Sequence, residues 1–185
     1  MLKLYGSARS RASIVHWYLE ELGIPYEFVK LDMQVGEHLQ PAYLAINPFG
    51  KVPAIVDGDF QLWESGAILL YLADKYSKTP LSPEERAVFS QWVLFANATL
   101  GPGIFGEENR EREMPRLLTP LNEIFSKQSF LHGNKFTIAD VAVGSILNYI
   151  PMILKLDLGP YPAVLNYMKQ LSERPAFQRS IGGRT

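Results

Sequence analysis

The chain has 185 residues, of which 47% are hydrophobic and 20% are charged, and its formal net charge is −1. This length and composition are typical of a globular protein with one large domain or two small ones, and the near-zero charge excludes the strongly basic surface that nucleic acid or an anionic membrane requires. The sequence contains no cysteine, which excludes disulfide bonds, thiolate zinc sites and cysteine nucleophiles.

The first part of the chain has the pattern of a strand, a helix and a second strand. Strand patterns at residues 2–5 and 26–29 flank an apolar helical stripe at 14–22, which Gly23 closes as a C-terminal cap. A less regular helix over 37–45 follows. The segment therefore predicts a βαβ unit with one further helix.

A β-hairpin and another helix come next. Asp57-Gly58 is a turn signal that joins strands at 54–56 and 60–62, and an amphipathic helix covers 65–76. The order βαβ, α, ββα, with right-handed crossovers, predicts a four-stranded mixed sheet with helices on both faces.

The character of the sequence changes near residue 77, and no strand pattern appears after that point. We expect one domain over residues 1–77, a linker over 78–83 and an all-α domain over 84–185. A capping box at Ser82 to Glu85 begins the first helix of this second domain.

The sequence pattern of the second domain predicts a series of helices separated by loops. We expect them from residue 83 to about 100, at 115–127, from 138 to about 151 and at 161–172, with a short turn after 175. Thr137 to Asp140 is a second helix-start signature, and the charge run at 107–113 is interpreted as a solvated loop or helix end.

The sequence has no motif for a metal site, a phosphate-binding loop, a signal peptide or a membrane-spanning helix. With three histidines in the chain, His16, His38 and His132, we expect no metal centre, and no glycine-rich phosphate-binding motif is present. The first residues have no apolar core of a signal peptide, and no apolar run reaches the roughly 18 residues of a membrane-spanning helix. We therefore expect a cytoplasmic protein.

Residues 47–76 carry the clearest functional signal. Val52-Pro53 places a proline at the mouth of a strand, where it removes a donor from the ladder. A cis bond there would turn the preceding backbone outward, where a peptide-like ligand pairs with it. Glu64-Ser65 opens a helix, where an anion and an ammonium group can both be held. Together these features predict a site for a small zwitterionic peptide.

Three motifs, in order and at these separations, resemble the soluble glutathione S-transferases: NPFGKVP at residues 47–53, Glu64-Ser65, and FTIAD at 136–140. The resemblance covers essentially the whole chain and is closest to the short prokaryotic branches, such as the chi class. It implies a thioredoxin-like first domain, an all-α second domain and a homodimer. Phe49 matches an aromatic that some classes insert into the partner subunit, and a buried anchor of its own loop is an equal alternative for this residue.

The resemblance implies how glutathione would be held. The cysteinyl amide would pair with the backbone of Val52, which a cis Pro53 presents. Ser65 and the first N–H groups of its helix would bind the γ-glutamyl carboxylate, and Glu64 would bind its ammonium group. Two cations, Lys51 and His38, would face the glycyl carboxylate.

The thiol activator is expected in the loop at residues 6–11. A free thiol has a pKa of about 8.5, and lowering it by two units requires about 2.7 kcal/mol of preferential thiolate stabilisation. Different classes of the family place their activator at different spacings. These spacings suggest three candidates in this chain, Arg11, Ser10 and Tyr5, in that order, and the sequence leaves the choice open. A cation at a helix N-terminus opposes the dipole, so Arg11 invites a functional explanation.

The resemblance implies addition of the glutathione thiolate to small hydrophobic electrophiles, with no metal and no cofactor beyond glutathione. The acceptor pocket is expected between the two halves, with Phe95, Thr99, Phe105 and the residues after Ser7 as candidate lining residues. An alternative is a non-catalytic binding or assembly module of the same fold. The absence of cysteine argues against a thiol–disulfide reductase that forms a mixed disulfide with the protein.

Overall fold

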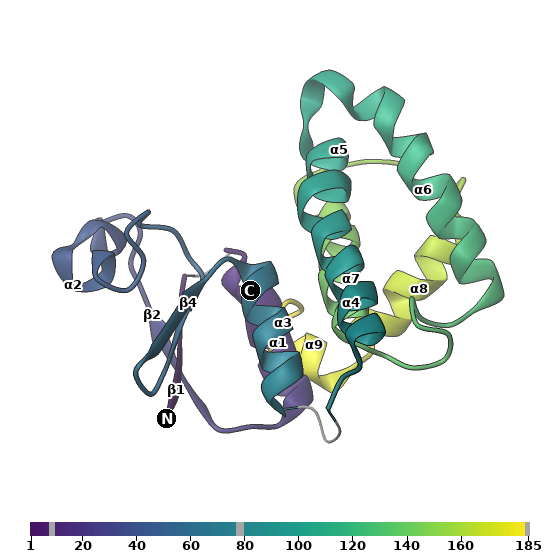
Figure 1. Ribbon diagram of the computed structural model, residues 1–185. Helices are drawn as coiled ribbons and strands as arrows, with labels where there is room; N and C mark the ends of the chain where they lie inside the picture. The colour runs from purple at the N-terminus through teal and green to yellow at the C-terminus, as the bar shows by residue number, and fades with distance from the viewer. Residues whose placement is uncertain (8–9, 77–79, 184–185) are drawn as a thin grey trace. The chain divides into compact units, whose positions relative to one another are not determined.

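The computed structural model describes residues 1–7, 10–76 and 80–183, and its described part forms two compact units. Unit 1 comprises Met1–Pro80 together with Pro175–Thr185, and unit 2 comprises Leu81–Arg174. Unit 1 contains a four-stranded mixed sheet and unit 2 is helical, so the predicted fold class is confirmed (Figure 1). No helix among the described residues is long and apolar enough to cross a membrane.

The sheet of unit 1 has the strand order β2-β1-β3-β4. Its strands are β1 (Leu2–Gly6), β2 (Tyr26–Lys30), β3 (Ala54–Asp57) and β4 (Phe60–Trp63). The β1–β2 pair is parallel, whereas the β1–β3 and β3–β4 pairs are antiparallel. β3 and β4 form the predicted hairpin, in which Gly58 has a φ of 64°.

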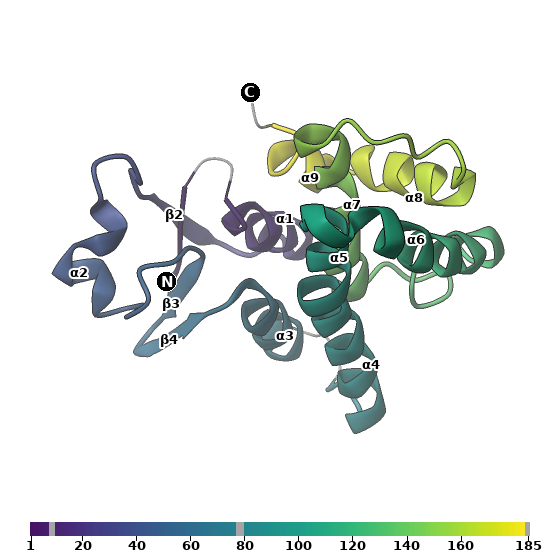
Figure 2. The ribbon, with the colours of Figure 1, turned by 90° about the horizontal axis from the view of Figure 1, so that it is seen from above.

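Two helices, α1 (Ala12–Leu22) and α3 (Ser65–Tyr76), cover one face of this sheet, and α2 (Pro41–Leu44) lies on the other side (Figures 1 and 2). Because side chains alternate along a strand, Leu2 and Leu4 of β1 enter the core beneath α1 and α3. Their neighbour Tyr5 points to the opposite face, where its ring centroid lies 5.8 Å from that of Tyr43 on α2.

The end of α1 follows the sequence prediction. Gly23 adopts a left-handed conformation, with a φ of 63°, and its N–H donates to the Leu19 carbonyl at 3.1 Å. A residue with a Cβ rarely adopts this conformation, whereas glycine does so at little cost. The cap ends the helix and directs the chain into β2.

The last helix, α9 (Pro175–Arg179), belongs to unit 1, although these residues were expected within the all-α domain. Phe177 packs edge-on against Trp17 of α1, with ring centroids 5.0 Å apart. Arg179 donates to the Glu20 carboxylate, also on α1. Aromatic packing and an ion pair therefore hold the end of the chain on the first unit.

Unit 2 consists of helices joined by short connections. They are α4 (Pro83–Leu94), the π-helical η2 (Phe95–Leu100), α5 (Gly101–Phe105), α6 (Arg110–Lys127), α7 (Ile138–Ile153) and α8 (Pro162–Ser172). The first helix was predicted to run to about Leu100, and its last part is the π-helical segment. The predicted capping boxes of α4 and α7 are both formed.

Helix α6 begins five residues earlier than predicted, within the charged run. A short 3-10 turn at Glu107–Asn109 leads into it, and Arg110 is its first residue. Arg110 Nε donates to the Ile104 carbonyl at 2.6 Å, and its Nη2 donates to the Phe105 carbonyl at 3.3 Å. These bonds satisfy the end of α5, where helical carbonyls lack partners in the helix itself.

A buried carboxylate organises the start of α7. Asp140 accepts hydrogen bonds from the N–H of Leu131 at 2.9 Å, the N–H of Thr137 at 2.8 Å and the hydroxyl of Tyr167 at 3.0 Å. Burial raises the pKa of Asp140, and this effect outweighs the hydrogen bonds that lower it. These bonds join the start of α7 to the loop before it and to Tyr167 of α8. The carboxylate therefore fixes the orientation of α7, which is buried along most of its length.

Candidate functional site

The register of the β3–β4 hairpin brings two predicted motifs together in unit 1. Ala54 pairs with Trp63, so the residues just before β3 lie beside the residues just after β4. Val52-Pro53 and Glu64-Ser65 are these residues. The Val52–Pro53 bond is cis, which confirms the predicted backbone geometry. The two motifs are thus neighbours at the open end of the β3–β4 hairpin.

The loop before Val52 is held by one buried side chain. Asn47 is 1% exposed; its Oδ1 accepts from the Phe49 N–H at 3.1 Å, and its Nδ2 donates to the Lys51 carbonyl at 2.7 Å. The hydroxyl of Tyr43 donates to the same carbonyl at 2.5 Å. The backbone on the N-terminal side of Val52 is therefore fixed from one side.

Gly50 is the residue that lets this loop close. Its φ is 59°, and a Cβ at this position would lie 2.9 Å from Leu39 Cδ2 and 3.1 Å from the His38 carbonyl oxygen. Both the backbone conformation and the space favour glycine. The loop consequently packs tightly against the residues that contain His38.

Val52 has backbone groups available to a ligand. Neither its N–H nor its carbonyl takes part in a hydrogen bond among the described residues, since it precedes β3 and lies outside the ladder. Its side chain is half-buried, and Pro53 is buried. A half-buried backbone with an open donor and acceptor suits an extended peptide.

The start of α3 provides groups for both charges of an amino acid. Ser65 is 3% exposed, and within the described part of the chain its hydroxyl makes no hydrogen bond. Glu64 is exposed and has a φ of 73°, and its carbonyl accepts from the Ile68 N–H at 3.0 Å. The first N–H groups of a helix attract an anion, and the Glu64 carboxylate attracts a cation.

The two predicted cations lie near the loop in different settings. Lys51 is exposed and follows Gly50 directly. His38 is half-buried in a 3-10 turn at Glu37–Leu39, and its carbonyl approaches Gly50. Its Nδ1 is buried and has no hydrogen-bond partner among the described residues, so the imidazole is not fixed by a neighbouring polar group on that side.

The three activator candidates occupy distinct positions, and Ala8 and Arg9 of the same loop lie outside the described residues. The half-buried Ser10 hydroxyl donates to the Ser7 carbonyl at 2.8 Å and accepts from the Ala12 N–H at 3.2 Å, at the start of α1. Arg11 is exposed at the N-cap of α1. Tyr5 packs on Tyr43 instead. Two candidates therefore lie at one helix N-terminus.

A cavity of about 650 Å³ opens beside this loop and was not predicted. Its lining residues belong to the loop after β1 and the segment after β2: Ser7, Lys30, Leu31, Asp32, Met33, Gln34 and Glu37. Gly6 pairs with Lys30 in the parallel β1–β2 ladder, so these two loops leave the sheet together. The carboxyl ends of neighbouring parallel strands often form ligand sites. The strand–helix–strand pattern of residues 2–29 predicted such a pair of strands, so it could have indicated this cavity.

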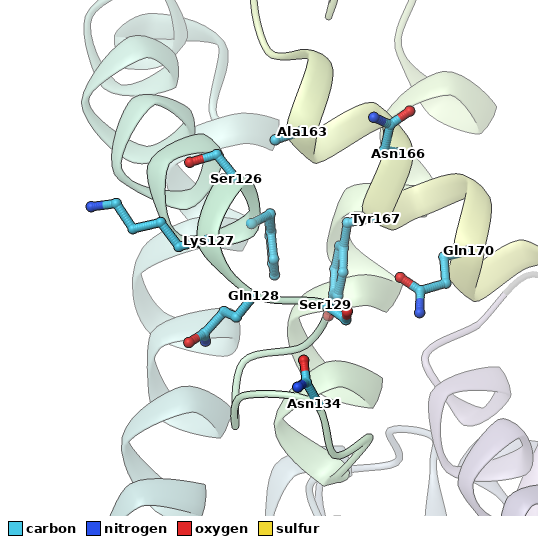
Figure 3. A pocket seen from close by; sticks show the side chains of 10 residues that line it. Ser126, Lys127, Gln128, Ser129, Asn134, Ala163, Asn166, Tyr167 and Gln170 are labelled. Carbon is cyan, nitrogen blue, oxygen red and sulfur yellow. The ribbon is translucent and has the colours of Figure 1, made fainter.

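A second cavity, of about 350 Å³, lies in unit 2 between the end of α6 and α8 (Figure 3). Phe125 and Tyr167 stack within it, with ring centroids 3.7 Å apart. The remaining lining side chains are mainly hydroxyls and amides: Ser126, Lys127, Gln128, Ser129, Asn134, Ala163, Asn166 and Gln170. The predicted acceptor residues Phe95, Thr99 and Phe105 do not line this cavity.

Comparisons with known proteins agree with the geometry. Residues 1–74 match the model of the glutathione S-transferase N-terminal domain, and residues 105–175 match that of the C-terminal domain. The chain is 33% identical to Disulfide-bond oxidoreductase YfcG of Escherichia coli (strain K12), over 98% of this chain and 94% of that protein. It is 30% identical to Glutathione S-transferase F9 of Arabidopsis thaliana, over 98% and 96% of the two chains.

A solved structure gives the same relationship in three dimensions. The glutathione transferase URE2P6 from Phanerochaete chrysosporium, in complex with oxidized glutathione, has 33% sequence identity and a TM-score of 0.85. The match covers 99% of this chain and 96% of that chain. The similarity therefore extends over both units and not over the sheet alone.

Proposed function

The chain belongs to the glutathione S-transferase family, and on that premise we propose that it binds glutathione and transfers its thiolate to small electrophiles. The observation that carries this proposal is that two motifs meet at the open end of the β3–β4 hairpin. The open backbone groups of Val52 lie beside Glu64 and Ser65 at the start of α3. These residues offer complementary groups for the cysteinyl amide and for both charges of the γ-glutamyl end.

Each part of glutathione has a proposed partner. The Val52 N–H and carbonyl pair with the cysteinyl residue in the manner of an added strand. Ser65 and the first N–H groups of α3 receive the γ-glutamyl carboxylate, and Glu64 receives its ammonium group. Lys51 and His38 face the glycyl carboxylate.

The thiolate is stabilised, in this proposal, at the N-terminus of α1. The Ser10 hydroxyl lies there and Arg11 is the N-cap residue, and the partial positive charge of a helix N-terminus acts in the same direction. The adjoining cavity beside Ser7, with Leu31 and Met33 in its lining, would take the electrophile. Tyr5 is assigned no direct role with the sulfur, because its ring packs on Tyr43.

The thiolate absorbance of bound glutathione, recorded against pH, tests this proposal. The wild type should ionise the bound thiol below its free pKa of about 8.5. Loss of the main activator, in Arg11→Ala or Ser10→Ala, should raise the bound pKa by about one unit or more, which corresponds to at least about 1.4 kcal/mol. Tyr5→Phe is the matched control and should leave the pKa unchanged.

Two outcomes of that titration would contradict the proposal. If the wild type binds glutathione without lowering the thiol pKa, and turns over neither chlorodinitrobenzene nor an isothiocyanate, the protein is a non-catalytic binding module. If only Tyr5→Phe raises the pKa, the activator lies on β1 and not at the start of α1.

Glutathione-dependent disulfide reduction is a second candidate function. The observation in its favour is the 33% identity to a protein named a disulfide-bond oxidoreductase. Without a protein cysteine, the bound thiolate would attack one sulfur of a substrate disulfide and expel the other as a thiolate. A second glutathione would then attack the glutathione mixed disulfide, releasing the remaining substrate thiolate and oxidised glutathione. Turnover of a dialkyl disulfide in preference to chlorodinitrobenzene would select this function.

We also propose that the chain forms a homodimer through Phe49. This ring is 64% exposed in the loop before β3 and packs against Trp63, with ring centroids 5.0 Å apart. An exposed aromatic anchor is typical of an interface hot spot. Phe49→Ala should weaken dimerisation at least tenfold in analytical ultracentrifugation, whereas Val35→Ala, another exposed apolar residue, should not. Equal dimer stability in the wild type and Phe49→Ala would contradict this role.

A further inference from the structure

The carbonyl of Lys51 receives two hydrogen bonds from buried side chains. Tyr43 Oη donates at 2.5 Å and Asn47 Nδ2 donates at 2.7 Å. The two donors are 3% and 1% exposed, respectively. Burial raises the pKa of the Tyr43 hydroxyl to about 12, so the hydroxyl remains a proton donor throughout the neutral range. Both lone pairs of this carbonyl are therefore engaged on the protein side.

The orientation of this carbonyl sets the direction of another group. The carbonyl of Lys51 and the N–H of Val52 belong to the same planar peptide unit, and in a trans peptide they point in opposite directions. The cis bond of this loop is the next one along, between Val52 and Pro53. Fixing the Lys51 oxygen toward Tyr43 and Asn47 consequently aims the Val52 N–H away from them.

Tyr43 is itself supported from the sheet. The ring of Tyr5, at the end of β1, lies against the ring of Tyr43 at an interplanar angle of 45°. The N–H of Asn47 also donates to the Tyr43 carbonyl at 2.9 Å. The Tyr43 ring thus packs against a strand and Asn47 is held by the backbone of Tyr43, so the two donors have little freedom to move with the loop.

We propose that Tyr43 and Asn47 are positioning residues, which aim the Val52 N–H at the cysteinyl carbonyl of glutathione. This inference rests on the proposed function of the same site. Neither side chain touches the ligand in this account. Their effect passes through one peptide plane, and Tyr5 contributes by holding the Tyr43 ring rather than by activating the thiol.

The test is calorimetric titration of the wild type and Tyr43→Phe with two ligands. One ligand is glutathione, and the other is an isostere in which an alkene replaces the cysteinyl–glycyl amide, so that it has no carbonyl for Val52. Tyr43→Phe should bind glutathione about five- to tenfold more weakly, as expected for one hydrogen bond. Its affinity for the isostere should stay within about twofold of the wild type, since the coupled partner is absent.

A tyrosine elsewhere in unit 1 serves as the matched control. The Tyr71 hydroxyl donates to the Asp57 carboxylate at 2.9 Å, and Tyr71→Phe should bind both ligands as the wild type does. Equal losses for glutathione and the isostere in Tyr43→Phe, or a similar loss in Tyr71→Phe, would overturn the inference, because either result indicates general destabilisation.

A second variant covers the case in which Tyr43→Phe does not fold. Asn47→Asp keeps an oxygen acceptor for the Phe49 N–H but removes the donor to Lys51, and it should weaken glutathione binding about tenfold while sparing the isostere. If the wild type itself does not bind glutathione, the proposed function and this inference fail together. If the wild type binds and neither variant is impaired, the inference alone fails.

Discussion

Replacing Asp140 with alanine is expected to lower the free energy of unfolding by about 3–5 kcal/mol. The carboxylate is buried at the start of α7 and accepts from the backbone of Leu131, the backbone of Thr137 and the hydroxyl of Tyr167. Alanine would leave the buried N–H groups of Leu131 and Thr137 without this acceptor, and each unpaired donor costs about 1–3 kcal/mol. The Tyr167 hydroxyl would keep only its long contact, at 3.5 Å, with the backbone carbonyl of residue 140. Urea denaturation followed by circular dichroism measures the change.

The control for Asp140 is an exposed aspartate in the same unit. Asp157 accepts one local hydrogen bond, from the Gly159 N–H at 2.8 Å, and Asp157→Ala should cost less than about 1 kcal/mol. Because burial raises the pKa of Asp140, its contribution is largest when it is protonated and is lost as the pH rises through the raised pKa. Asp140→Ala should lack this pH dependence, and a stability within about 1 kcal/mol of the wild type would contradict its structural role.

Features with a local signal were predicted well from the sequence. Gly23 marks the end of α1 because a left-handed cap requires glycine. The capping boxes at Ser82 and Thr137 were recognised because the residues that bond each other are three apart. The Val52–Pro53 bond was recognised from its position at the mouth of a strand. In each case the interacting groups are close in the sequence.

Features that depend on distant contacts were not predicted. The pairing of α9 with α1 joins Arg179 to Glu20, 159 residues apart, and no local pattern indicates it. Arg110 begins α6 because its side chain reaches back to α5, whereas its charge suggested only a solvated run. The hydrogen bond from Tyr43 to Lys51 joins a helix to a loop. It depends on the path of that loop, which no local sequence pattern indicates.

Replacing Glu64 with glycine is expected to separate stability from binding. Glu64 has a φ of 73°, a conformation that costs a residue with a side chain about 1–2 kcal/mol and glycine almost nothing. Relief of this strain offsets the greater freedom that glycine gives the unfolded chain. We therefore expect the free energy of unfolding to stay constant or rise by up to about 1 kcal/mol, while the affinity for glutathione falls about 10- to 100-fold.

Two variants distinguish the backbone effect from the charge effect. Glu64→Gln keeps the strained backbone and removes the charge, so it should weaken glutathione binding about tenfold without any gain in stability. Gln61→Gly, at an exposed position in β4, should cost about 0.5–1 kcal/mol, because no strain is relieved there. Strained residues persist where the surrounding structure holds them for a function. Wild-type affinity for glutathione in Glu64→Gly would therefore remove the reason for a glutamate at this position and, with it, the proposed contact with the γ-glutamyl ammonium group.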